Sequence, residues 1–508
     1  MDNTIIGEIY YMENKSLWLR GMRFNKNKPI EKNESCDILI IGGGMAGLNT
    51  AYFLMNKGYK IILVDKNTCG KGISAYTTGK LTYMQELNYH KIKENYNDDI
   101  AYKYLESQKD AIRLIKGIIN KNNIDCNLDS ASAYVFTNEI DRLKDFKKEE
   151  SFYLDHDIKY KEKNMLPIKI DSLYNIKTNF SYVFHPVKYM LSLKKILLNN
   201  GVIIYEDSLA SLIEKKEDRY YVKVNDSYID CTYLVVASHY PFFIKPGFIP
   251  FKTSVERSYV VSGIVNKYKK IEGISYQKEF YSFRYHLDKK SYFLLGSGSH
   301  MVNDLVNSAS YYQDVLRKYK NLFNDDIKYY WTNHDILTYD RIPLIGRVND
   351  KEKNFYIMTG FNTWGMTNSV LGGKIISDLI LEKENPYIEL FNPKRKISMD
   401  KIKNILVYGL SSMKSYTLSK LNKNHSFYKE NVLVISKNNK VYGIYIDKKG
   451  NRHVVNNTCP HMGCSLIFNY TDKTWDCPCH ASRYDIDGNI LYGPSTFNIK
   501  VDDFIDRS

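Results

Sequence analysis

"CDILIIGGGMAGLNTAYFLMNKGYKIILVDK", residues 36 to 66, is the stretch that decides the fold of this chain. It begins with an apolar run, continues through a glycine turn and an apolar-striped segment, and ends in a second apolar run. The stripe from Leu48 to Met55 has the i, i+3, i+4, i+7 spacing of a helix, and Gly58 is placed to end that helix. The segment therefore predicts a strand–helix–strand unit of a Rossmann-type α/β fold.

Three glycines in this turn follow the pattern G-x-G-x-x-G. Gly42 makes the tight turn, Gly44 lets a pyrophosphate approach the backbone, and Gly47 allows the helix to pack closely on the strand. Asp65 ends the second strand, where it would accept hydrogen bonds from ribose hydroxyls. The alternative is a glycine-rich turn in some other α/β fold, and the spacing to Asp65 disfavours it. The pattern serves FAD and NAD alike, so it does not choose between them.

Four further segments carry a resemblance to a known family. They are "ISAYTTGKLT" at 73 to 82, "LVVASHYPF" at 234 to 242, "TYDRIPLIGR" at 338 to 347 and "TGFNTWGMTNS" at 359 to 369. In order and position they resemble the D-amino-acid oxidase and glycine oxidase-like superfamily of FAD enzymes, over about residues 36 to 385. The resemblance implies FAD as the cofactor and an α/β FAD-binding Rossmann-type domain with an inserted β-rich substrate domain.

The same resemblance implies which residues contact FAD. Thr77, Thr78 and Lys80 are expected near the flavin, with Gly365 and Met366 on the turn before a closing helix, against the ring. The full set of expected contacts is Gly42, Gly44, Met45, Ala46, Gly47, Asp65, Lys66, Thr77, Thr78, Lys80, Ala237, Gly360, Gly365 and Met366.

A second glycine cluster, "LLGSGSHM" at 294 to 301, does not make a second dinucleotide site. The position three after Gly298 is Met301, and no clear strand–helix repeat follows. With a single nucleotide fingerprint, a built-in NAD(P)H site is disfavoured, and we expect the substrate to reduce the flavin directly.

Half of the eight cysteines lie in "CPHMGC" at 459 to 464 and "CPCH" at 477 to 480. Cys459 and His461 stand in the first loop, and Cys477 and His480 in the second. Two cysteines and two histidines are the ligands of a Rieske 2Fe-2S centre. A structural zinc site is the alternative, but zinc fingers favour paired cysteines and paired histidines, whereas each loop here supplies one of each. The pattern therefore favours a Rieske cluster with ligands Cys459, His461, Cys477 and His480.

The segment around these loops is similar to high-potential Rieske proteins, in which the second cysteines of the two loops form a disulfide. The resemblance implies a Cys464–Cys479 bond. It also implies that Ser482 and Tyr484 direct hydroxyls to the cluster sulfurs and that "YGPS" at 492 to 495 covers the cluster. Ala481 stands where the family usually has glycine, a departure that we expect to cost little.

Composition sets the limits of the remaining interpretation. A chain of 508 residues, 44% hydrophobic, can bury more than one core. No apolar run approaches the roughly 18 residues of a membrane span, and residues 1 to 16 lack the features of a signal peptide. We therefore expect a cytoplasmic protein with no transmembrane segment. The net charge of +15 is spread along the chain without a nucleic-acid motif, so we expect no nucleic-acid partner.

The pattern of segments predicts four parts of the chain. We expect mainly helices over 85 to 180, strands over 201 to 237 and 253 to 300, and a strand, glycine turn and helix over 353 to 382. The predicted parts are an N-terminal extension (1–35), an FAD-dependent oxidoreductase body (36–392), a helical linker with an amphipathic helix at 400 to 421 (393–428) and an all-β Rieske domain (429–508).

This order of parts resembles the bacterial FAD-dependent oxidoreductases with a C-terminal Rieske domain. We expect an enzyme in which a small substrate, an amine or amino acid, reduces FAD and the electrons pass to the cluster and then to an external acceptor such as a protein. The catalytic residues are unknown, and candidates on the substrate side are Arg284, His239 and Arg341, since an arginine would hold a carboxylate bidentately. Each of the three has an alternative structural role.

A second hypothesis is an electron-transfer module that relays electrons from a reductant to a partner protein without turning over a small substrate. A Rieske oxygenase is excluded, because the histidines before residue 430 show no compact pairing for the mononuclear iron that such an enzyme needs.

Overall fold

The structure is a computed structural model that describes residues 12–302, 308–323, 326–395, 431–438 and 440–501, together with the backbone of 427–429. Contacts within the chain divide it into two units. The first unit contains Met1–His239, Arg257–Ser299 and Tyr311–Lys396, and the second contains Tyr240–Glu256, His300–Ser310 and Ile397–Ser508. The predicted boundaries at 392 and 428 stay predictions, because most of the chain between them lies outside the described residues.

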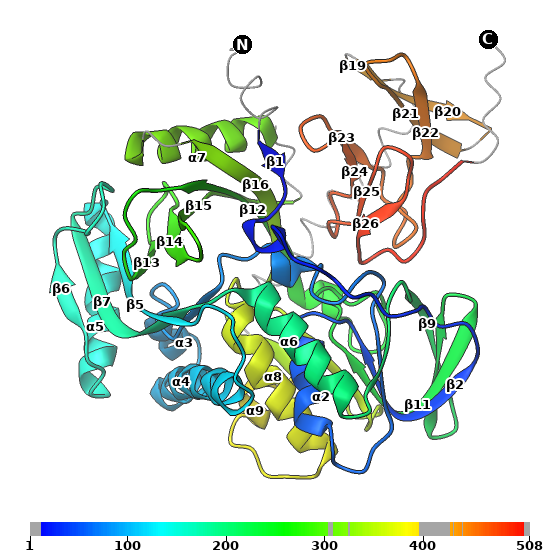
Figure 1. Cartoon of the computed structure of the whole chain (residues 1–508), viewed down its shortest axis with the longest axis horizontal. Helices are drawn as coiled ribbons and strands as arrows, with labels where there is room; N and C mark the ends of the chain where they lie inside the picture. Colours follow the sequence, from blue (N-terminus) through cyan, green and yellow to red (C-terminus); the bar gives the residue numbers. More distant parts are fainter. Residues whose placement is uncertain are drawn as a thin grey trace. The chain divides into compact units, whose positions relative to one another are not determined.

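The predicted strand–helix–strand unit lies at the centre of a largely parallel sheet in the first unit (Figure 1). The sheet order is β17-β18-β11-β2-β3-β8, with β10 beside β11 and β9 beside β10. Strand β17 runs antiparallel to β18, whereas β18, β11, β2, β3 and β8 run parallel to one another. All four residues of β3 are buried, as expected of a strand covered on both faces. The bounds are β2 Glu34–Ile41, β3 Ile61–Val64, β8 Ile203–Tyr205, β9 Ala210–Lys216, β10 Arg219–Val224, β11 Ser227–Val236, β17 Leu344–Arg347 and β18 Phe355–Thr359.

Helix α2 (Met45–Leu54) follows β2 and contacts both α6 (Pro186–Asn199) and α8 (Gly365–Ile380) (Figure 1). The approach of α2 to α8 depends on Gly373, where a Cβ atom would lie 2.8 Å from the Thr50 backbone nitrogen. Strand β18 and helix α8 confirm the strand and closing helix predicted over 353 to 382. The predicted end of the first helix was wrong: α2 stops at Leu54, and Gly58 (φ +84°) lies in the turn that leads into β3.

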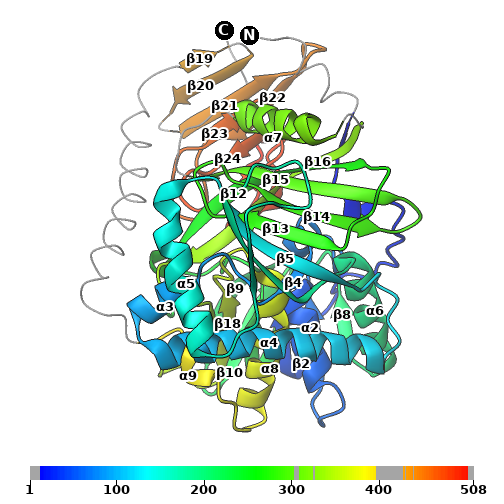
Figure 2. The ribbon, with the colours of Figure 1, turned by 90° about the vertical axis from the view of Figure 1, so that its left-hand side faces the viewer.

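A second sheet of the first unit is mixed and lies above α4 in Figure 2. Its order is β1-β16-β12-β15-β14-β13-β5-β7-β4, with β6 beside β7. The strands predicted over 253 to 300 are confirmed, and the "LLGSGSHM" cluster lies inside β15. The bounds are β1 Glu13–Asn14, β4 Lys80–Thr82, β5 Asp129–Thr137, β6 Lys161–Lys163, β7 Tyr174–Val183, β12 Thr253–Ile264, β13 Ile271–Ser275, β14 Ser282–Leu287, β15 Ser291–Met301 and β16 Ile327–Thr338.

The mainly helical prediction for 85 to 180 was only partly right. Helices form there, but β5, β6 and β7 form as well. A register shift between Ala131 and Ala133 interrupts the alternation along β5, and β5 pairs with β13, which is distant in the sequence. Neither feature leaves a local pattern, so tertiary pairing decided the structure. The helix bounds are α3 Tyr89–Asn95, α4 Asp98–Lys121, α5 Leu143–Asp155, α7 Ser308–Leu322 and α9 Ile388–Phe391.

The segment predicted as an N-terminal extension takes part in the first unit. Strand β1 pairs with β16, and Trp18, in the 3-10 turn Leu17–Leu19, is fully buried in the core. A second buried core lines the mixed sheet and is rich in tyrosine and phenylalanine.

The predicted all-β character of the C-terminal region is confirmed by two antiparallel sheets, each of four strands in the described residues. Trp475 is fully buried and packs so closely on Gly443 that a Cβ there would lie 2.4 Å from the indole. The predicted helix at 400 to 421 lies outside the described residues. Among described residues, no helix has both the length and the apolar character needed to cross a membrane. The strands are β19 Phe427–Lys429, β20 Val432–Lys437, β21 Lys440–Ile446, β22 Arg452–Asn456, β23 Ile467–Asn469, β24 Thr474–Asp476, β25 Arg483–Tyr484 and β26 Ile490–Tyr492.

Candidate dinucleotide site and metal centre

The glycine turn between β2 and α2 has no room for side chains. Gly42 has φ +114°, and a Cβ there would lie 2.5 Å from the Ala237 carbonyl oxygen. A Cβ on Gly47 would lie 1.9 Å from the Gly42 carbonyl oxygen. Only glycine fits at these two positions, because each added atom would meet backbone. The turn thus brings the predicted contact Ala237, which follows β11, directly against Gly42.

The start of α2 suits an anionic group. Gly44 precedes the helix without a side-chain cap, and Met45 and Ala46 form its first turn with no acidic residue. The Met45 N–H donates to Ser74 Oγ at 3.2 Å. Unpaired N–H groups and the helix dipole favour a phosphate at such an end. The bare glycine cradle and this helix start therefore fit the pyrophosphate of a dinucleotide.

Asp65 connects the turn to the end of β3. Its Oδ2 accepts from the Gly43 N–H at 2.6 Å and its Oδ1 accepts from the Asn67 N–H at 2.7 Å. Burial lowers the pKa of the adjacent Lys66, although the Asp65 charge opposes that shift. Each Asp65 oxygen keeps a lone pair that could accept a ribose hydroxyl.

The loop Thr77–Lys80 is held by side chains from distant parts of the chain. Trp18 Nε1 donates to the Thr77 carbonyl at 2.6 Å, and Trp331 Nε1 donates to the Tyr76 carbonyl at 2.9 Å. Neither tryptophan was predicted as a site residue, since neither belongs to a motif with characteristic spacing. The short apolar run "LWL" at 17 to 19 was the one available signal.

Arg284 supports the same loop, which argues against its expected role in substrate binding. Its side chain is fully buried, and Nη1 lies within hydrogen-bonding distance of the carbonyls of Thr78, Gly79 and Phe184 at 3.0, 2.6 and 3.1 Å. Nε donates to the Tyr285 carbonyl at 3.0 Å. The donors that would hold a carboxylate are therefore largely engaged by backbone oxygens.

Lys80 begins β4 and directs its ammonium into the mixed sheet. Nζ donates to the Gly273 carbonyl at 2.7 Å and to Ser282 Oγ at 2.8 Å, and it lies 3.8 Å from Glu272 Oε2. Burial lowers the pKa of Lys80 to about 8, with Glu272 opposing the shift. The structure thus assigns Lys80 to a buried polar cluster, and its contact with a flavin stays a prediction.

The turn from Gly360 to Met366 leads into α8. Gly360 has φ +70°, and a Cβ there would lie 2.4 Å from Thr338 Cγ2. Asn362 Oδ1 accepts from the Thr338 N–H at 2.7 Å, which ties this turn to the end of β16. Gly365 is the first residue of α8, and Met366 is buried beside it. The predicted contacts at this turn therefore lie together at a helix start.

The other two candidates for the substrate side, His239 and Arg341, lie in the loops after β11 and β16. Both have positive φ, +68° and +66°, which is uncommon for residues with side chains and is often found at functional sites. Burial lowers the pKa of His239 to about 4, so the ring is neutral at pH 7. Arg341 is 41% exposed, and its Nη1 lies 3.8 Å from Glu86 Oε2.

The Arg341 loop is anchored by a buried ion pair. Arg395 donates to both oxygens of Asp340 at 2.6 and 2.7 Å and also to the Pro343 carbonyl. Tyr96 donates to the same carboxylate at 2.7 Å. Burial alone would raise the pKa of Asp340, but Arg395 lowers it overall.

The second unit brings together the four predicted metal ligands. Cys459, Cys477 and His480 are buried, and His461 is half-buried. The Cys477 thiol hydrogen-bonds to the Cys459 sulfur and lowers the pKa of Cys459 to about 6. The rings of His461 and His480 meet edge to face, with centroids 5.1 Å apart.

Both imidazoles have the protonation state and the unshared nitrogen that a metal ligand needs. Burial lowers the pKa of His461 to about 4 and that of His480 to about 3, so both rings are neutral at pH 7. Among the described residues, His461 Nε2 and His480 Nδ1 are buried without a hydrogen-bond partner. Two thiols and two neutral imidazoles with unshared ring nitrogens fit a 2Fe-2S cluster of the Rieske type.

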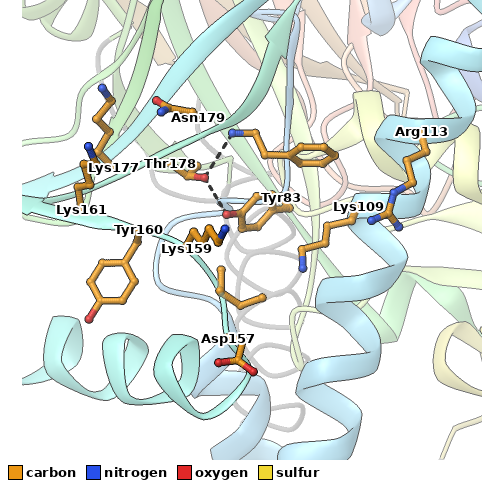
Figure 3. Close-up of a pocket in the computed structure, with 12 residues that line it drawn as sticks. Tyr83, Lys109, Arg113, Asp157, Lys159, Tyr160, Lys161, Lys177, Thr178 and Asn179 are labelled. Carbon is orange, nitrogen blue, oxygen red and sulfur yellow. Dashed lines mark hydrogen bonds between the residues drawn. The ribbon is translucent and has the colours of Figure 1, made fainter.

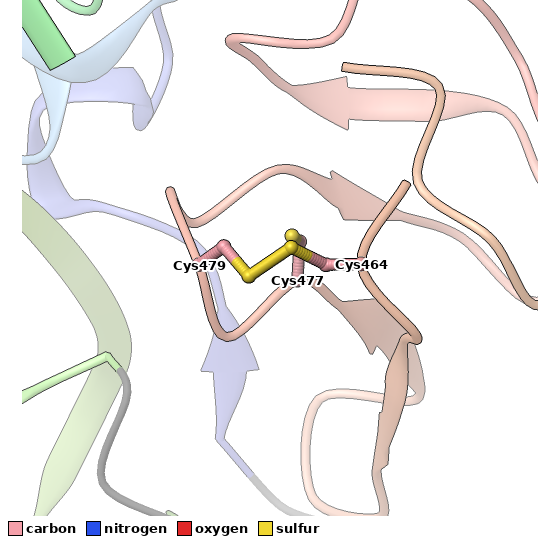
Figure 4. A group of neighbouring side chains, drawn as sticks. All are labelled: Cys464, Cys477 and Cys479. Carbon is pink, nitrogen blue, oxygen red and sulfur yellow. A yellow bond between two sulfur atoms is a disulfide. The ribbon is translucent and has the colours of Figure 1, made fainter. Parts of the chain in front are cut away.

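The remaining two cysteines of these loops form a disulfide. Figure 4 shows the Cys464–Cys479 bond beside Cys477, and the three sulfur atoms lie within 4.8 Å of one another. The pairing is the one implied by the sequence resemblance. Because a disulfide sulfur is no thiolate ligand, Cys459 and Cys477 are the sulfur donors that remain in the two loops.

Hydroxyl groups surround the Cys459 sulfur. Tyr484 Oη lies 3.6 Å from Sγ, and Ser482 also hydrogen-bonds to this thiol. The Ser482 Oγ accepts in turn from the Ser495 N–H at 3.0 Å, which connects the "YGPS" loop to the centre. Ala481 has φ +64°, a left-handed conformation that suits glycine. The cost of having alanine there is therefore larger than the sequence analysis expected.

Comparisons with known proteins agree with both sites. Residues 37–379 match the family model "FAD dependent oxidoreductase", and residues 418–501 match "Rieske [2Fe-2S] domain". The Rieske 2Fe-2S iron-sulfur protein YhfW of Bacillus subtilis is 30% identical over 96% of this chain and 97% of its own length. Gamma-glutamylputrescine oxidoreductase of Escherichia coli is 23% identical over 70% of this chain and 87% of its own length.

A solved structure shows the same fold in the first unit. Glycine oxidase from Geobacillus kaustophilus superimposes with a TM-score of 0.61 over 72% of this chain and 100% of its own, at 16% sequence identity. FAD and a 2Fe-2S cluster are accordingly the cofactors of this protein. The chain belongs to the FAD-dependent oxidoreductase family and carries a C-terminal Rieske domain.

Proposed function

We propose that this oxidoreductase oxidises a small amine or amino acid and delivers the electrons to an external acceptor. The observation that carries the proposal is the joint presence, in one chain, of the dinucleotide cradle at Gly42–Gly47 and the four-ligand centre at Cys459–His480. When bound, FAD supplies hydride acceptance and the 2Fe-2S cluster supplies one-electron transfer. The relatives support the substrate class, since the Escherichia coli protein is named for a polyamine derivative and the solved structure for glycine.

The residues of the chain have distinct roles in this proposal. The glycine cradle and the start of α2 would hold the pyrophosphate, and Asp65 would hold the ribose. The Thr77–Gly79 loop, the Gly360–Met366 turn and Ala237 would surround the rest of the cofactor. Cys459, Cys477, His461 and His480 would hold the cluster.

Arg341 is the better candidate for a residue that binds a substrate carboxylate. Arg284 is engaged by carbonyl oxygens, whereas Arg341 is partly exposed and only loosely paired with Glu86. A guanidinium with free donors can hold a carboxylate through two parallel hydrogen bonds. Its loop is fixed by the Asp340–Arg395 pair, so the side chain starts from a defined backbone position.

The proposal is tested by an anaerobic titration of the holoprotein with a mixture of amines and amino acids, followed by absorbance and electron paramagnetic resonance. Bleaching of the flavin followed by a reduced Rieske signal is the expected result, and fractionation of the mixture then identifies the substrate. If chemical or enzymatic reductants alone reduce both centres, the proposal fails and the chain is an electron-transfer module.

Arg341→Ala then tests the substrate-side assignment. Losing a charged hydrogen-bonding pair costs about 1.5–3 kcal/mol, so KM for a carboxylate-bearing substrate should rise by roughly 10- to 100-fold. Arg347→Ala is the matched control, because Arg347 is an exposed arginine on β17 whose Nε donates to the Lys353 carbonyl. Equal KM values for the two variants would remove Arg341 from the substrate site.

A further inference from the structure

The first unit contains a basic hollow that the proposed function does not use. It has a volume of about 630 Å³ and lies between α4, the segment Asp157–Lys161 and strand β7 (Figure 3). A volume of this size is within the range of small-molecule sites. Neither the glycine cradle nor any of the predicted FAD contacts lines it.

The charges that line the hollow are unbalanced. Five cationic side chains line it, namely Lys109, Arg113, Lys159, Lys161 and Lys177, against one acidic residue, Asp157. Lys109 pairs with Glu106 at 2.7 Å and Arg113 pairs with Asp110 at 2.6 Å. In the part of the chain that the structure describes, no carboxylate lies within ion-pair distance of Lys159, Lys161 or Lys177. These three lysines therefore have no carboxylate partner among the described residues, against the single acidic residue Asp157 in the lining.

Two of these lysines are placed against each other. Lys161 of β6 and Lys177 of β7 are direct partners across the antiparallel pair. Like charges at opposed positions of a sheet are destabilising. Burial lowers the pKa of Lys177, and the charges of Lys163 and Lys161 lower it further. An anion between the two strands and α4 would relieve this repulsion.

Aromatic side chains form the floor of the hollow. Tyr83 and Thr178 are buried there and share a hydrogen bond of 2.7 Å. The Tyr83 and Phe180 rings lie 6.0 Å apart, and the Lys109 ammonium lies 5.7 Å from the Tyr83 ring centre. In Figure 3, Lys109 and Arg113 stand on one side of the hollow and Lys161 and Lys177 on the other, with Lys159 between them.

We propose that this hollow binds a compact polyanion, a small molecule with two or more phosphate or carboxylate groups. Cations that converge from three elements around a concave site surround a small ligand on several sides. A stable protein interface takes about 20–30 residues from each partner. The hollow is lined by twelve residues, which suits a small ligand better. None of the substrate-side candidates Arg284, His239 and Arg341 lines the hollow, so this proposal does not rest on the proposed function and the two stand or fall independently.

The test is isothermal titration calorimetry on the FAD-loaded full chain with inorganic pyrophosphate, ATP and citrate as probes. Pyrophosphate or ATP binding would identify phosphate as the preferred group, and citrate binding would identify carboxylate. We expect Lys161→Gln/Lys177→Gln to weaken the best probe by at least tenfold, with unchanged circular dichroism and flavin absorbance.

The matched control is Lys169→Gln/Lys195→Gln, which removes the same charge from two exposed lysines that do not line the hollow. An equal loss in both double variants would show that only the net charge matters, and this would overturn the proposal. Failure of all three probes to bind the unaltered protein would overturn it as well. So would binding of poly-L-glutamate alone, which would assign the surface to an acidic protein.

Discussion

The metal centre of the second unit and the Thr77–Lys80 loop of the first unit are built in different ways. The metal centre takes its donors from two short loops, and the Cys464–Cys479 disulfide joins them across 15 residues. The Thr77–Lys80 loop is held by Trp18, Trp331 and Arg284, which lie 59 to 255 residues from the groups they bind. A site assembled from contiguous sequence can therefore be predicted residue by residue, whereas one supported by residues distant in the sequence cannot.

The largest effect is expected from removing a donor of the metal centre. Cys459→Ser replaces a predicted thiolate ligand by a hydroxyl, which binds iron poorly. We expect the reduced Rieske signal in electron paramagnetic resonance and nearly all bound iron to be lost, while flavin absorbance stays unchanged. Cys231→Ser is the control, because Cys231 is a buried free cysteine of the first unit. A variant that keeps its cluster would show that the two loops are not the complete ligand set.

The second largest effect is expected at the glycine turn of the dinucleotide site. Like the metal centre, this turn is built from contiguous sequence, and its close contacts are made by backbone atoms. Gly47→Ala places a Cβ 1.9 Å from the Gly42 carbonyl oxygen. Because the clashing atom belongs to the backbone, relieving the clash requires the turn itself to shift. We expect a loss of about 3 kcal/mol, at the upper end of the range for overpacking, and release of FAD on gel filtration.

Gly117→Ala is the matched control for this prediction. Gly117 lies inside α4, where an added Cβ meets nothing within 4 Å. Alanine is the better helix former, so this variant should gain about 0.5–1 kcal/mol and keep its FAD. Equal losses in the two variants, measured by urea unfolding, would show that the close approach at Gly47 is not needed.

The third effect concerns the support of the Thr77–Lys80 loop. Arg284→Met keeps much of the buried volume but leaves the carbonyls of Thr78, Gly79 and Phe184 without this donor. We expect a loss of about 2 kcal/mol in unfolding free energy, the cost of unsatisfied buried acceptors, together with weaker FAD retention. KM for a carboxylate-bearing substrate should stay within twofold once FAD is saturating. A rise in KM without loss of stability would return Arg284 to the substrate site.

The parts of the fold and site that were predicted depend on short-range rules. Glycine spacing predicted the cradle because steric exclusion acts over a few residues, and the Cys and His spacing pointed to the candidate donors because two short loops carry these four residues. Strands β5 and β7 were missed because they pair with each other across the intervening α5 segment and with the more distant β13 and β4, so no local pattern marks them. Arg284 was one of three candidates for the substrate side because an arginine suits a carboxylate, whereas its burial among backbone carbonyls is known only from the fold.

The smallest effect is expected at Ala481, in the second loop of the metal centre, where backbone strain lowers stability. Ala481 has φ +64° directly after the ligand His480, and the left-handed conformation costs an L-residue roughly 1–2 kcal/mol. Ala481→Gly removes that strain, but it also gives the unfolded chain more freedom. We therefore expect a net gain of about 1 kcal/mol in the stability of the second unit, measured by urea unfolding of the holoprotein.

A control variant and the cluster potential test the prediction for Ala481→Gly. Lys473→Gly changes another residue with positive φ (+52°) in the same unit, in a turn outside the ligand loops, and should gain a similar amount. Ala481 lies between His480, a predicted ligand, and Ser482, whose hydroxyl bonds to the Cys459 thiol. Any shift in the cluster potential should therefore occur in Ala481→Gly and not in Lys473→Gly. A loss of stability in Ala481→Gly would mean that the methyl group, which is 1% exposed, contributes more packing energy than the backbone strain costs. The metal centre would then depend on close packing in the same way as the glycine turn at Gly42–Gly47 in the first unit.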